Sequence, residues 1–97
     1  MFKVEQTVKR IRVRNCIRKD TYRYYIPQSK YKDMMKSIED SFGEIKKLGD
    51  FDLYQIDHGQ VLMRFFPQEC TLTLIKKNTF VVSTEEKIHS LIGFNNV

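Results

Sequence analysis

The residues best suited to chemistry in this sequence are five arginines that lie close together near its start. An arginine guanidinium binds phosphate or carboxylate through two parallel hydrogen bonds, and its flat surface stacks on unpaired bases. The same stretch contains one acidic residue, Asp20, so most of this positive charge has no acid close by in the sequence. The cluster therefore predicts an anionic partner. The arginines are Arg10, Arg12, Arg14, Arg18 and Arg23.

The net charge is distributed unevenly along the 97 residues of the chain. Residues 1–36 contain 11 basic and 3 acidic residues, which gives a net charge of +8. The remaining residues contain 6 basic and 9 acidic residues, and they reduce the total to +5. Such an asymmetry indicates contact with nucleic acid or with another charged surface. The apolar fraction of 41% is that of a folded protein and excludes a disordered tail.

An alternating pattern places the arginines on a β-hairpin. Over residues 8–18 basic and apolar residues alternate, which predicts a strand with one apolar face and one basic face. Residues 19–20 are expected to form the turn, and residues 21–26 the second strand. In this register Arg14 lies opposite Tyr25, and the five arginines share one face. The predicted binding face consists of Arg10, Arg12, Arg14, Arg18, Arg23 and Tyr25.

This basic face predicts a small, non-enzymatic nucleic-acid-binding protein. Tyr25 beside Arg14 offers a platform on which an unpaired base can stack. No recognition helix is evident, so RNA or single-stranded nucleic acid is favoured over reading of a duplex. One alternative partner is an acidic protein surface. The chain contains no alanine, which suggests an AT-rich coding source and fits a small inhibitor or adaptor of phage or plasmid type.

Patterns typical of catalysis or metal binding are absent from the sequence. No phosphate-binding glycine loop, nucleophile elbow or zinc motif occurs, and Cys16 and Cys70 are far apart. A second alternative is a small ribonuclease in which His58 acts with an arginine such as Arg64. Cys16 is predicted on the basic face, but no base accompanies it as a nucleophile would require. We expect no catalytic residue, cofactor or metal, and reduced thiols in a cytoplasmic protein.

The clearest predicted element is a long helix over about residues 29–48. Apolar residues recur there at spacings of three and four, which predicts a stripe that packs on a sheet. Ser29 is suited to cap the start of the helix, and Gly49 is suited to end it. The stripe consists of Tyr31, Met34, Met35, Ile38, Phe42, Ile45 and Leu48.

Strands are predicted after this helix. The expected strands cover residues 51–57, 61–65, 72–74 and 79–82, and turn signals separate them. Ser83 and Glu86 have the spacing of a capping box, which predicts a short helix over about residues 84–92. No linker or repeat interrupts the chain, so we expect a single domain over residues 1–97.

These elements define an α+β fold with the order ββ-α-ββββ-α. Short connections between strands imply an antiparallel sheet of five or six strands with both helices on one face. The other face is then uncovered, and an exposed strand edge can pair two chains as a homodimer. A similar element order, with one strand fewer, occurs in each half of the TATA-binding-protein fold, whose sheet face contacts nucleic acid. No apolar run is long enough to cross a membrane, so we expect no membrane partner.

Overall fold

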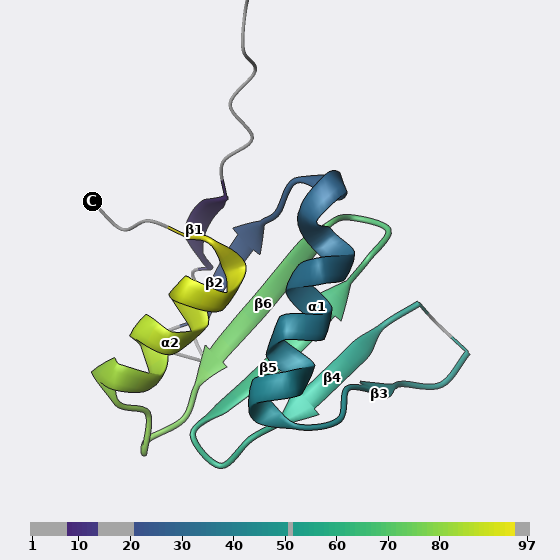
Figure 1. Ribbon diagram of the computed structural model, residues 1–97. Helices are drawn as coiled ribbons and strands as arrows, with labels where there is room; N and C mark the ends of the chain where they lie inside the picture. Colours follow the sequence, from purple (N-terminus) through teal and green to yellow (C-terminus); the bar gives the residue numbers. More distant parts are fainter. Residues whose placement is uncertain (1–7, 14–20, 51, 95–97) are drawn as a thin grey trace, which may run out of the picture.

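The described residues form one six-stranded sheet and two helices. The computed structural model describes residues 8–13, 21–50 and 52–94. All strand pairs are antiparallel, and the strands lie in the order β1-β2-β6-β5-β4-β3 (Figure 1). This confirms the predicted α+β class and the order ββ-α-ββββ-α. The elements are β1 (Lys9–Val13), β2 (Thr21–Tyr25), α1 (Gln28–Phe42), β3 (Lys46–Lys47), β4 (Tyr54–Asp57), β5 (Val61–Phe66), β6 (Thr71–Lys76) and α2 (Val82–Ile92).

The core lies between the sheet and the two helices, which cover the same face as predicted (Figure 1). Alternate residues of the central strands point into this core, and Met63, Phe65 and Leu74 are completely buried. Met34 and Ile38 of α1 are buried one turn apart, which is typical of a helix packed on a sheet. Burial of each such side chain contributes about 1.5–3 kcal/mol. Because these side chains point into the core, the residues that alternate with them along each strand point to the opposite face of the sheet.

The long helix is shorter than predicted, because it ends at Phe42 rather than near residue 48. Gly43 has φ 116°, a conformation that residues with a Cβ rarely adopt, and it interrupts the helix. The Glu39 carboxylate then accepts a hydrogen bond from the Ile45 backbone N–H at 3.0 Å. Residues 46–47 form the short edge strand β3 instead of the last helical turn. Ser29 lies inside the helix, and Pro27 occupies the capping position.

The strand predicted over residues 79–82 is also wrong. Phe80 donates its backbone N–H to the Lys77 carbonyl at 3.0 Å, which closes a turn, and α2 begins at Val82. The N-cap is Val81, without a side-chain capping bond, so Ser83 does not form the predicted capping box. Val81 and Val82 are apolar and β-branched, which favours a strand in the sequence, but both are exposed in the structure. Neither helix of the described residues is long and apolar enough to cross a membrane.

The predicted register of the first hairpin is wrong as well. Arg10 lies opposite Tyr24 and Arg12 opposite Tyr22, and the predicted turn at residues 19–20 lies outside the described residues. The predicted pairing joined residues of odd and even number, whereas the observed pairing joins residues of the same parity. An odd shift exchanges the two faces of one strand relative to its neighbour. The arginines of β1 consequently lie on the opposite face from Arg23.

Candidate functional site

A row of side chains crosses the sheet on the face opposite the helices, which we call the open face. Tyr24 points toward α2, where its hydroxyl bonds His89, so the adjacent Arg23 points to the open face. Cross-strand pairing then continues this row over all the strands. Among the described residues no helix covers this face (Figure 1). In order from β1 to β3, the row consists of Ile11, Arg23, Thr73, Arg64, Gln55 and Lys46.

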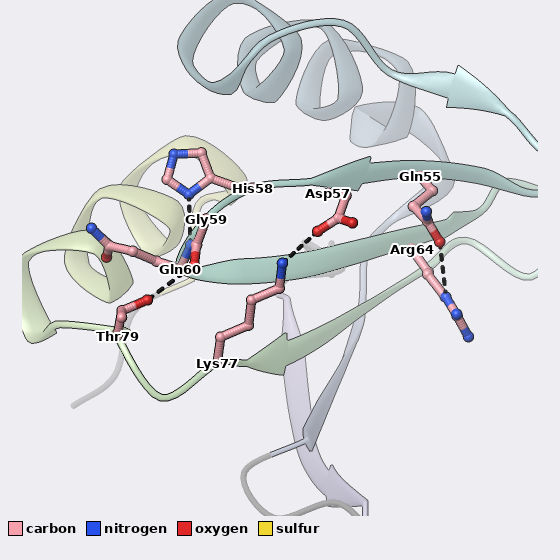
Figure 2. A network of polar contacts seen from close by, with 8 residues as sticks. All are labelled: Gln55, Asp57, His58, Gly59, Gln60, Arg64, Lys77 and Thr79. Atoms are coloured by element: carbon pink, nitrogen blue, oxygen red, sulfur yellow. Dashed lines mark hydrogen bonds and ion pairs between the residues drawn. The ribbon is translucent and has the colours of Figure 1, made fainter.

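Two arginines occupy the centre of this row, one on each side of Thr73. Their Cα atoms are separated by two strand spacings, which is about 10 Å. Arg64 donates from Nε to the Gln55 side-chain oxygen at 3.2 Å, and it extends away from the helices (Figure 2). This bond orients the guanidinium and leaves its two terminal amino groups for another acceptor. Arg23 and Arg64 are both half-buried, and no described acid forms an ion pair with either of them.

The open face carries little negative charge among the described residues. Asp57 is the one acidic residue that the strand registers place there, opposite Leu62 of β5. Its carboxylate is already bonded by the ammonium group of Lys77 (Figure 2). Lys9 and Lys46, at the two outer strands, add positive charge to the same face. The face is therefore a cationic surface whose central arginines have no acidic partner in the described chain.

Aromatic side chains lie beside the two arginines. Tyr25 is the next residue on the open face of β2 after Arg23, and it is 40% exposed. Phe66 is the next residue on the open face of β5 after Arg64, and it is half-buried. Thr71 lies between the two aromatic residues in the register and is only 2% exposed. No exposed polar side chain therefore lies between Tyr25 and Phe66 in this register.

Arg10 has a different environment on the helix-covered face. Its guanidinium carbon lies 4.9 Å from the centre of the Tyr22 ring and 5.0 Å from that of Phe94. Such contacts each contribute about 0.5–2 kcal/mol, depending on how well water is excluded. Arg10 is half-buried in this position. Its charge is therefore engaged in attaching the edge strand to the end of α2.

The neighbouring polar pair supports this structural role. The Tyr24 hydroxyl and Nε2 of His89 are 2.8 Å apart, and both residues are buried. Burial raises the pKa of Tyr24 to about 12, against a hydrogen bond from Arg10 that lowers it. Burial also lowers the pKa of His89, against the opposing charge of Glu85. At neutral pH an uncharged tyrosine hydroxyl is therefore bonded to an uncharged imidazole.

The predicted binding face is consequently divided. Arg23 and Tyr25 lie on the open face, whereas Arg10 and Arg12 lie on the helix-covered face, where Arg12 is exposed. Arg14, Arg18 and Cys16 lie outside the described residues. Tyr25 faces Lys9 in the register, rather than the predicted Arg14.

Sequence reasoning missed three contributors to the open face. These are Arg64, Phe66 and Thr73, which come from β5 and β6 rather than from the hairpin. Alternation along β5 indicates that Arg64 and Phe66 lie on the open face, because they alternate with the buried Met63 and Phe65. What was missing was the order of the strands, which brings β2 next to β6.

The residues suggested for a ribonuclease are not brought together. His58 lies on the side of α1, where its ring contacts Phe42 edge-on with centroids 5.3 Å apart. Its Nδ1 accepts the backbone N–H of Gln60 at 3.2 Å, as part of the β4–β5 turn (Figure 2). Arg64 extends from the opposite face in the same view. In the described part of the chain, no group of histidine, cysteine and acidic residues could hold a metal ion.

Comparison of the chain with protein-family models, with curated proteins and with solved structures finds no match.

Proposed function

We propose that this chain is a non-enzymatic nucleic-acid-binding protein whose open face contacts the phosphate backbone. The observation that supports this proposal is the pair Arg23 and Arg64, which flank Thr73 without an acidic partner in the described chain. Two guanidinium groups on half-buried residues whose Cα atoms are about 10 Å apart repel one another until an anion lies between them. A phosphate satisfies both guanidinium groups, and the Thr73 hydroxyl can donate a third hydrogen bond.

The distribution of charge extends this contact across the sheet. Lys9 and Lys46 are exposed at the two sides of the open face. A polyanion that crosses the strands meets a positive charge near each side and two at the centre. Contacts of this kind release bound counterions, so the affinity depends steeply on salt.

The test is a salt titration with a labelled RNA oligonucleotide, followed by fluorescence anisotropy. The double variant Arg23→Gln/Arg64→Gln should reduce the slope of log affinity against log salt by about 0.7, since the two arginines share one phosphate and each phosphate contact on a single strand contributes about 0.7. The matched control is Lys32→Gln/Lys36→Gln, which removes the same charge from exposed positions of α1. Undetectable binding at about 50 mM salt, where such contacts are strong, would exclude the proposal.

A second candidate function is docking on an acidic protein surface, as an inhibitor or adaptor. The observation that favours it is Ile11, an apolar side chain that is 47% exposed beside Arg23 on the open face. Exposed apolar groups next to arginines are typical of protein interfaces. A stoichiometric partner that persists after nuclease treatment and is lost in Ile11→Ser would support this candidate. Retention of that partner in both Ile11→Ser and Arg23→Glu would place its contact elsewhere.

A further inference from the structure

The open face contains the same short pattern twice. Arg23-Tyr24-Tyr25 in β2 and Arg64-Phe65-Phe66 in β5 each present an arginine and an aromatic ring to this face, with a core residue between them. Both strands are antiparallel to β6, so they run in the same direction. The two arginines and the two rings are therefore in matching register across β6. We call each of these three-residue patterns a unit. The unit in β2 is related to the unit in β5 by a shift of two strand spacings, about 10 Å.

We infer that each unit receives one nucleotide of a single strand, which deepens the proposed function and rests on it. The bases stack on Tyr25 and Phe66, and the phosphate that links the two nucleotides lies between Arg23 and Arg64 above Thr73. Within one strand, the Cα atoms of the arginine and of the aromatic residue two positions later are about 6.5–7 Å apart. This distance is within the span of one nucleotide. Aromatic stacking accepts any base, so this site recognises single-stranded nucleic acid without strong sequence preference.

The aromatic residues are what select a single strand over a duplex. In a duplex the faces of the bases are covered by their neighbours, and no face is free to contact a protein ring. Tyr25 presents an exposed ring, and the buried Thr71 leaves no exposed polar group between this ring and Phe66. Phosphate contacts alone would not select the single strand, because a duplex has the higher charge density along its axis.

The experiment compares three labelled probes of equal length at about 50 mM salt: a uridine oligonucleotide, the same backbone with abasic sites, and a duplex. We expect the uridine strand to bind at least tenfold more tightly than either of the others. Tyr25→Leu and Phe66→Leu should each weaken binding of that strand by about tenfold, because stacking is lost, while the salt slope stays unchanged. The matched control is Phe42→Leu, which replaces a half-buried aromatic side chain on the other side of the sheet.

A second measurement keeps the inference testable if a leucine variant does not fold. The chain contains no tryptophan, so Tyr25→Trp introduces a single indole at the proposed stacking position. Its fluorescence should be quenched by the uridine strand and unaffected by the abasic one. Equal affinity for all three probes, or no quenching on binding, would overturn stacking while leaving phosphate binding intact. Failure of all three probes to bind would overturn the proposed function itself.

Discussion

Arg10 and Arg23 belong to neighbouring strands of one hairpin, yet they lie on opposite faces of the sheet and have opposite environments. Arg10 contacts the rings of both Tyr22 and Phe94, so its charge is already engaged. Arg23 lies beside Thr73, and no described acid neutralises it. The number of arginines in a strand pair therefore does not measure a binding surface. What matters is which of them the fold has left without a partner.

Removing the two central arginines of the open face gives the largest expected effect on affinity. Arg23→Gln/Arg64→Gln should reduce affinity for an RNA strand by about tenfold at about 50 mM salt, since the two arginines share one phosphate contact and such a contact contributes roughly tenfold there. Its unfolding free energy should change by less than about 0.5 kcal/mol, as for other surface substitutions. Anisotropy titration and urea denaturation measure the two quantities on the same samples.

Arg10→Gln should give the reverse result. It removes two cation–ring contacts and a hydrogen bond to Tyr24, so we expect a loss of about 1–3 kcal/mol of stability. The fraction that remains folded should bind RNA within about threefold of the unmodified protein. A large loss of affinity with unchanged stability would instead place the binding surface on the helix-covered face.

Neighbouring tyrosines permit a finer comparison of the two faces. Tyr24→Phe removes the hydroxyl that bonds His89 and should cost about 1–2 kcal/mol, because a buried ring nitrogen loses its hydrogen-bond partner. Tyr25→Phe removes the hydroxyl of a ring that is 40% exposed, and it should change stability by less than about 0.5 kcal/mol. Thermal and urea denaturation of the pair test this difference. Equal losses in the two variants would contradict the assignment of Tyr24 to the core.

Local patterns were sufficient to predict much of the fold. Alternation in β5 and the helical spacing of Met34 and Ile38 arise directly from burial, so period alone identifies them. The end of α1 was harder, because Ile45 and Leu48 continue the helical period beyond the residue at which Gly43 interrupts it. Val82 was misassigned for the related reason that an apolar residue need not be buried.

The hairpin register was not encoded in the same local way. Two-residue and longer connections both preserve alternation within each strand, and they differ only in how the faces of the two strands combine. The packing of Tyr22 and Tyr24 against the helices decides between them, and this depends on contacts with distant α2. Arg64 joins Arg23 for a similar reason, since β6 separates them in space and residues 24–63 separate them in sequence.

Acidification should weaken the helix-covered face. His89 has a lowered pKa in the folded protein, with burial as the main cause, so the unfolded chain binds its proton more readily. The stability that comes from this residue is therefore complete above about pH 6.5 and is lost as the pH falls below that value. Urea denaturation between pH 7.5 and 5.5 should show this decline, and His89→Gln should flatten it. An unchanged decline in the variant would assign the effect to other groups.

The smallest effect concerns the one acid that the strand registers place on the open face. Asp57 is bonded to Lys77 near the surface, and such exposed pairs contribute about 0–1 kcal/mol to stability. Asp57→Asn removes one negative charge and releases the lysine, so affinity for an RNA strand should rise by about two- to threefold. The increase should disappear at high salt, where surface charges are screened. Lys77→Gln, which removes the other partner, should lower affinity by a similar factor. If both variants changed affinity in the same direction, the effect would arise from the conformation of the β4–β5 turn, and the open face would not bind through its charge.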